Sequence, residues 1–82
     1  MTTHRLKTWP RYFAAVYEGR KTYEVRRDDR GFNVGDILHL VEWSIHGGET
    51  GREVKHTITY ISRQSSLIPL PAGYVIMALG PA

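Results

Sequence analysis

The 82-residue chain contains no cysteine and no long apolar run, and each absence excludes a class of protein. Without cysteine there is no disulfide framework, thiolate zinc site, iron–sulfur cluster or cysteine nucleophile. No apolar run approaches the roughly 18–20 residues that cross a bilayer, and the polar start, Met1 to Arg5, lacks the pattern of a signal peptide. We therefore expect a cytoplasmic protein with no membrane partner.

What the chain does contain is typical of one globular domain, residues 1–82, with 41% hydrophobic and 23% charged residues. The net charge of +3 is unevenly distributed, because residues 1–30 carry eight basic and four acidic side chains and the remainder carries three and four. An anionic partner would therefore meet the first third of the chain. The alternative is a solvated basic surface without a ligand.

The clearest local pattern predicts a helix that starts at Thr8-Trp9-Pro10. Thr8 is expected as the N-cap, and proline fits the first helical turn. Gly19 stands where a left-handed C-terminal cap is expected. Between these ends, apolar side chains recur with the helical period and predict a stripe that faces the core: Trp9, Tyr12, Phe13, Val16 and Tyr17.

The rest of the chain has the period of two that is typical of strands. In the segment that starts at Thr22, Tyr23 and Val25 are expected to face the core, with Glu24 and Arg26 together on the other face. A hairpin connection is expected around Gly47-Gly48, and the proline-containing segment 63–72 is expected to be irregular. The extended segments predict one helix packed on a curled, mostly antiparallel sheet of about five strands: 4–7, 22–26, 37–43, 53–62 and 74–79.

The turn after the helix and the strand that follows it place three charged side chains together. Lys21 lies in the turn, and Glu24 and Arg26 project from one face of the strand, where residues two apart are roughly 6.5–7 Å apart. Two cations and one carboxylate in a cleft can neutralise a phosphate and hydrogen-bond the edge of a base. The alternative is a solvated face with an ion pair that contributes about 0–1 kcal/mol.

These residues also resemble a known family. The spacing G-x-K-x-x-E-x-R, formed here by Gly19, Lys21, Glu24 and Arg26, is the signature of the ASCH domain, a branch of the PUA-like superfamily. The chain is similar along nearly its whole length, from His4 to Leu79, to a small ASCH-like group of bacterial and phage proteins. The further matching positions are His4, Leu6, Lys7, Pro10, Tyr12, Phe13, Asp29, Arg30, Phe32, Val34-Gly35-Asp36, Glu42-Trp43, Thr50-Gly51-Arg52 and Gly73-Tyr74-Val75-Ile76.

The resemblance implies a fold and a site. The fold would be α+β: a small PUA-like mixed, mostly antiparallel β-barrel of about five strands with one N-terminal helix. The implied function is binding of RNA or a nucleotide-like ligand by a monomer that needs no cofactor. The implied cleft lies beside the helix and is lined by the signature side chains Lys21, Glu24 and Arg26, with further cations on its rim: Lys7, Arg27 and Arg30.

Two departures from the family's pattern bear on this interpretation. The group usually has asparagine where Asp28 stands, so the loop carries an extra negative charge. Some ASCH relatives remove the acyl group from N4-acylated cytidine with a lysine base, a threonine nucleophile and a downstream glutamate. Lys21 matches the base, but Glu24 occupies the threonine position, so this activity is not expected to carry over unchanged. A ribonuclease or modified-nucleoside hydrolase that uses Lys21 and Glu24 as acid and base remains an alternative, as does a protein-interaction module.

Aromatic and histidine side chains offer two further hypotheses. Phe32, in a polar loop beside Arg30, is the best candidate for stacking on a base, and the alternative is that it plugs one end of the barrel. A hairpin symmetric about Gly47-Gly48 would place His39 opposite His56. Because two imidazoles do not complete a metal site, we expect a hydrogen-bonded pair and no metal.

Overall fold

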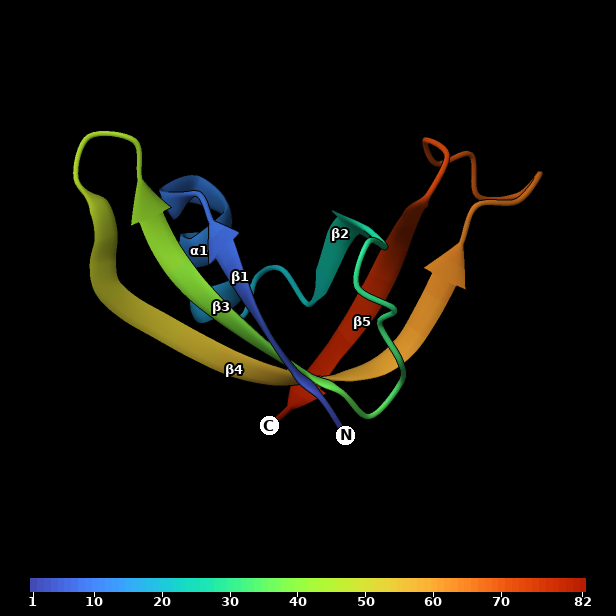
Figure 1. The fold of residues 1–82 in the computed structure, drawn as a ribbon, viewed down its shortest axis with the longest axis horizontal. Helices are drawn as coiled ribbons and strands as arrows, with labels where there is room; N and C mark the ends of the chain where they lie inside the picture. The colour runs from blue at the N-terminus through green and yellow to red at the C-terminus, as the bar shows by residue number, and fades with distance from the viewer.

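The computed structural model describes all 82 residues and contains one helix and five strands (Figure 1). The predicted helix, the five extended segments and the irregular stretch before the last strand are all present, with ends that differ by a few residues. In chain order the elements are β1 (Thr3–Thr8), α1 (Pro10–Tyr17), β2 (Tyr23–Arg27), β3 (Ile37–Ser44), β4 (Gly48–Arg63) and β5 (Tyr74–Pro81).

The five strands form a single mixed sheet in the order β1-β3-β4-β5-β2. Only β1 and β3 are parallel, so the mostly antiparallel sheet is as expected. The sheet curls into a trough, with β1 and β2 as its two edges (Figure 1). The expected closed barrel is wrong: the sheet is a half-barrel, because β1 and β2 do not pair and charged side chains lie between them.

The core lies inside the curl, under the helix. On β1 the burial alternates, with Leu6 inside and its neighbours Arg5 and Lys7 exposed. Burying a large apolar side chain contributes roughly 1.5–3 kcal/mol, so the cluster of buried apolar side chains inside the curl is the main source of stability. Its nine members come from α1, from four of the strands and from the loop before β3: Leu6, Phe13, Val16, Phe32, Leu38, Leu40, Ile58, Val75 and Met77.

The helix begins one residue later than predicted. Trp9 has extended backbone angles and occupies the N-cap without a side-chain cap, so Thr8 is the last residue of β1. The predicted apolar stripe is only partly buried: Phe13 and Val16 are in the core, whereas Trp9 is 51% exposed. The helix has eight residues and packs on the β3 end of the trough, so one side of the stripe faces open space. No helix of the molecule has the length and apolar character needed to span a bilayer.

The strand β2 faces the opposite way from the prediction. Glu24 is 2% exposed, whereas Tyr23 and Val25 are exposed. Glu24 and Arg26 do share one face, as predicted, but it is the inner face of the curl. A carboxylate tolerates such burial only where it has charged or hydrogen-bonding partners, and the interior supplies two of them.

The predicted pairing of His39 with His56 is also wrong. The turn is centred on His46, because Ser44 pairs with Gly48, and a bulge between Val41 and Trp43 shifts the register once more. His39 therefore lies opposite Lys55, and His56 lies opposite Leu38. Adjacent positions on a strand face opposite sides of the sheet, so the two imidazoles are on different faces. The Nδ1–H of His56 donates to a backbone carbonyl of β5, 3.1 Å away. No group of three or more metal-ligating side chains comes together.

Candidate functional site

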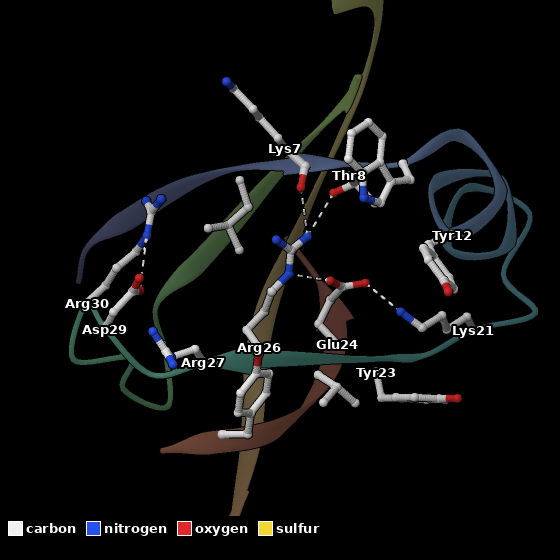
Figure 2. A pocket seen from close by; sticks show the side chains of 14 residues that line it. Lys7, Thr8, Tyr12, Lys21, Tyr23, Glu24, Arg26, Arg27, Asp29 and Arg30 are labelled. Carbon is white, nitrogen blue, oxygen red and sulfur yellow. Dashed lines mark hydrogen bonds and ion pairs between the residues drawn. The ribbon is translucent and has the colours of Figure 1, made fainter. Parts of the chain in front are cut away.

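A pocket of about 810 Å³ lies at the open seam of the half-barrel, between the edge strands β1 and β2 (Figure 2). The end of β1, the N-cap and first turns of α1, the whole of β2, the start of the loop after β2 and Tyr74 line it. Its volume lies within the roughly 300–1,000 Å³ of ligand sites in proteins. The pocket therefore occupies the place where a fifth strand pairing, between β1 and β2, would close the barrel.

The three charged side chains of the signature converge at the centre of this pocket. One carboxylate oxygen of Glu24, Oε1, accepts a hydrogen bond from Lys21 Nζ at 2.7 Å. The other, Oε2, accepts from Arg26 Nε at 3.0 Å. Gly19 has a φ of 81°, which lets the chain leave α1 and bring Lys21 back toward the pocket. The predicted meeting of Lys21, Glu24 and Arg26 is confirmed, and Glu24 fixes the orientation of both cations.

The guanidinium group of Arg26 bridges the two edge strands. Its Nη2 donates to the Lys7 carbonyl and to the Thr8 hydroxyl, both at 3.1 Å. Its Nε donates to Glu24, as described above. The remaining nitrogen, Nη1, donates to no protein atom. Arg26 is thus held by three contacts on one side and keeps two free N–H donors on the other.

A second arginine, Arg30, makes a similar contact with β1 two residues before Lys7. Arg30 Nη1 donates to the Arg5 carbonyl at 3.2 Å. Residues two apart direct their carbonyls to the same side of a strand, so Arg5 and Lys7 present theirs at the free edge of β1. Arginine side chains satisfy both carbonyls in place of a neighbouring strand. Arg30 also lies 3.8 Å from the exposed carboxylate of Asp29.

The other predicted rim residues differ in their placement. Arg27 lines the pocket and is exposed, and its side chain makes no hydrogen bond or ion pair. Lys7 contributes its carbonyl to the contact with Arg26, but its ammonium group points away from the other charged side chains (Figure 2). The ammonium lies 4.0 Å from the centre of the Trp43 ring, outside the pocket. Lys7 therefore supplies a carbonyl to the seam, and its expected role as a rim cation needs correction.

Of the two roles expected for Phe32, stacking on a ligand and filling the interior of the sheet, the structure shows the second. Phe32 is 1% exposed, belongs to the core and lies 4.7 Å from the His4 ring in an edge-to-face arrangement. It does not line the pocket, so it cannot stack on a ligand there. Its position beside Arg30 in the sequence suggested exposure, but the loop turns its side chain inward.

The extra negative charge at Asp28 is directed away from the pocket. Its carboxylate accepts hydrogen bonds from the backbone of Gly31 and Phe32, both at 3.0 Å, and from Arg63 Nη1 at 2.8 Å. The Arg63 hydrogen bond and these backbone donors lower the pKa of Asp28 below its ordinary value of 3.8. Asp28 therefore shapes the loop and fastens it to β4, and the charge of the pocket is unaffected.

The aromatic lining of the pocket was not predicted from the sequence. Trp9, Tyr12 and Tyr23 are about half exposed and line it together with Tyr74. Lys21 Nζ lies 5.6 Å from the Tyr12 ring centre and 5.1 Å from that of Tyr23. Trp9 and Tyr12 fitted the period of a core stripe, but an eight-residue helix on one end of a sheet has no room to bury five large apolar side chains.

Glu42 and Arg52, which are among the positions that match the ASCH-like group, have structural roles outside the pocket. Glu42 is buried and accepts a 2.6 Å hydrogen bond from the Thr50 hydroxyl. Arg52 follows Thr50 by two residues. Its guanidinium carbon lies 5.2 Å from the centre of the Phe13 ring and 4.9 Å from that of the Tyr17 ring. These contacts hold α1 against the β3–β4 hairpin.

A buried hydrogen bond joins the start of β1 to the residue that precedes β3. His4 Nε2 lies 2.9 Å from Asp36 Oδ2. Asp36 also accepts hydrogen bonds from the backbone of Thr2 and Asn33. The His4 contact, followed by the Thr2 backbone bond, lowers the pKa of Asp36 below its ordinary value of 3.8.

Comparison with known proteins supplies a family for the chain. It is 42% identical over 59 residues to a protein of Escherichia phage P2 that is called an uncharacterized 12.9 kDa protein in the GpA 3′ region. The alignment covers 72% of the chain, which spans about half (53%) of the length of this curated relative. The family model described as a domain of unknown function, DUF3850, matches residues 3–79. Because this match covers nearly the whole chain, the chain belongs to the DUF3850 family.

Proposed function

We propose that the pocket between β1 and β2 binds a nucleotide, either free or as part of an RNA strand. The observation that carries the proposal is the presence of aromatic rings and guanidinium groups in the same pocket. Aromatic rings stack on bases, and guanidinium groups bind phosphates, so a ligand with both parts is the best chemical match. The similarity of residues 19–26 to the ASCH signature supports the same ligand class.

The charge of the pocket favours an anionic ligand. Apart from Lys7, whose ammonium points away, four cationic side chains line it: Lys21, Arg26, Arg27 and Arg30. The lining carboxylates are Glu24 and Asp29, so the cations exceed them by two. Glu24 is almost inaccessible and has both oxygens occupied. It therefore acts through Lys21 and Arg26 and does not contact the ligand itself.

Catalysis by Lys21 and Glu24 is the second candidate, and it rests on the 2.7 Å contact between them. A substrate would have to reach Glu24 past Lys21 and Arg26, which cover both oxygens. The arrangement therefore favours binding over proton transfer. Turnover of RNA or an acylated nucleoside by the wild-type chain, abolished in Glu24→Gln, would reverse this ranking.

Intrinsic fluorescence offers a direct test, because one of the two tryptophans, Trp9, lines the pocket. In a Trp43→Phe background, titration with mononucleotides and short RNA or DNA strands should give saturable quenching of Trp9. Lys21→Ala should weaken binding about tenfold, because the buried carboxylate of Glu24 loses one of its two cationic partners and repels an anionic ligand. Added salt should weaken binding further.

Lys55→Ala is the matched control, because it removes the same charge from an exposed position on β4 outside the pocket. Its affinity should equal that of the Trp43→Phe parent. Equal affinities for Lys21→Ala, Arg26→Ala and Lys55→Ala would contradict the proposed site. Saturable binding of a protein partner at this pocket, with no response to any nucleic acid, would favour an interaction module instead.

A further inference from the structure

The pocket has two chemically different ends, on either side of the Glu24–Arg26 contact (Figure 2). At one end, Tyr12 and Tyr23 lie around Lys21. At the other, Arg27 and Arg30 project from the end of β2 and the loop that follows it, and Tyr74 of β5 lies opposite Arg27. A ligand that contacts both ends would therefore touch the rings of Tyr12 and Tyr23 at one end and guanidinium groups at the other.

The arginine end has unused hydrogen-bond donors. Arg26 Nη1 has no protein partner, and Arg27 has none for its whole side chain. Arg30 uses Nη1 on the Arg5 carbonyl and lies near Asp29 through Nε, which leaves Nη2 free. Three guanidinium groups face one exposed carboxylate, so the local charge is positive. Planar guanidinium groups match the oxygens of a phosphate, often with two parallel bonds.

The aromatic end has no such excess of charge. The ammonium of Lys21 is 2.7 Å from Glu24, so the two charges offset each other. Tyr12 and Tyr23, each about half exposed, lie around this neutral pair. Trp9, also about half exposed, lines the pocket at the N-cap of α1. Stacking of a base on an aromatic side chain contributes about 1–3 kcal/mol and does not depend on which base is present. This end therefore suits a base better than a phosphate.

We propose, as a refinement that rests on the proposed function, that the ligand lies in one direction along the pocket. Its base stacks at the aromatic end, against Trp9, Tyr12 and Tyr23. Its phosphate binds at the arginine end, to Arg26, Arg27 and Arg30. The ligand class is accordingly a phosphorylated nucleoside, and the phosphate contributes affinity that a nucleoside alone lacks.

The test compares adenosine with adenosine 5′-monophosphate, and cytidine with its monophosphate, by calorimetry at low salt. In the wild-type chain each monophosphate should bind about tenfold more tightly than its nucleoside, as expected for one charge-assisted contact. Arg27→Ala is the cleanest variant, because Arg27 makes no contact that stabilises the seam. It should reduce the ratio of the two affinities by at least about threefold, and Arg30→Ala should do the same.

Tyr12→Ala is expected to have the complementary effect. It should weaken both ligands by a similar factor, about fivefold or more, and leave the ratio unchanged. Inorganic phosphate should compete with the monophosphate at the arginine end and leave adenosine bound. Lys55→Ala, which removes a cation outside the pocket, should reproduce the wild-type ratio. RNA oligomers that bind where free mononucleotides do not would assign the phosphorylated nucleoside to a strand.

The results separate the two proposals. If nucleotides bind but the phosphate contribution survives in both Arg27→Ala and Arg30→Ala, or disappears equally in Tyr12→Ala, the direction of binding is wrong and the proposed function stands. If no nucleoside, nucleotide or RNA oligomer binds the folded chain, the proposed function itself is overturned.

Discussion

The closed side of the half-barrel and its open seam are held together by different interactions. On the closed side, β3, β4 and β5 pair through long backbone ladders, each with one bulge, over an apolar core. At the seam, the edge carbonyls of Arg5 and Lys7 accept hydrogen bonds from the side chains of Arg30 and Arg26. Side chains thus replace a strand at the seam, and they leave a pocket that a backbone ladder would have filled.

This difference explains why β2 turns charged side chains inward. Glu24 is buried at the seam because Lys21 and Arg26 accompany it from the same short segment. On the closed side, β3 and β4 bury apolar side chains such as Leu38 and Ile58. Stability should therefore depend mainly on the closed side, and ligand binding mainly on the seam.

The largest effect on stability is expected from a truncation on the closed side. Leu38→Ala removes a fully buried side chain from β3 and should lower the free energy of unfolding by about 3 kcal/mol. Urea denaturation measures this change, and the affinity of the molecules that remain folded should be unaffected. A loss below about 1 kcal/mol would show that the core is not the main source of stability.

A smaller loss is expected at the seam. Glu24→Gln removes the counter-charge of Lys21 and Arg26, both partly exposed, and should lower the free energy of unfolding by about 1–2 kcal/mol. The matched control is Glu49→Gln, which breaks the exposed pair of Glu49 with Arg5 and should change stability by about 0–1 kcal/mol. Equal losses in the two variants would mean that burial at the seam has no energetic consequence.

Low pH should weaken the contacts of Asp36 with Thr2 and His4, which attach the start of β1 to the closed side. Because the folded-state pKa of Asp36 is lowered, its contribution is fully present above its unfolded pKa, near 3.8, and is lost as pH falls through the folded value. Asp28 changes in the same direction, for the same reason. The urea midpoint should therefore fall as the pH is lowered below about pH 4. If the urea midpoint of Asp36→Asn fell as much at low pH as that of the wild-type chain, other groups would be responsible for the fall.

The smallest effect is expected for Lys7, whose ammonium lies over Trp43 outside the pocket. Lys7→Ala should lower the free energy of unfolding by about 0.5–1 kcal/mol, the contribution of an exposed cation–π contact. Its effect on nucleotide affinity should be well below that of Lys21→Ala. A loss of affinity as large as that of Lys21→Ala would restore Lys7 to the rim of the site.

Some of this organisation was predictable from local pattern. The helical period found α1, and the spacing of Lys21, Glu24 and Arg26 found the centre of the pocket. The direction in which β2 faces was not predictable, since it depends on the Lys7 carbonyl and the Thr8 hydroxyl of a distant strand. Likewise, the hairpin register depends on a turn centred on His46 and on the bulge beside Trp43, and neither follows from the position of Gly47-Gly48 in the sequence.

The aromatic lining shows the same limit from another side. Trp9 and Tyr12 have the period of buried residues, and only the docking of α1 on one end of the sheet decides that they line a pocket. Phe32 has polar neighbours in the sequence, and only the path of its loop decides that it is buried. Local pattern therefore found the charges of the site and missed the rings.

The most direct test of the central claim is amide chemical-shift mapping with a short single-stranded RNA and with mononucleotides. We predict saturable shifts confined to the end of β1, the start of α1, the segment from Gly19 to Arg30 and the amide of Tyr74. The Lys55 amide, on β4 outside the pocket, should not respond. Shifts centred on the β3–β4 hairpin, or no saturable shift with any of these ligands, would contradict a nucleotide site at the seam.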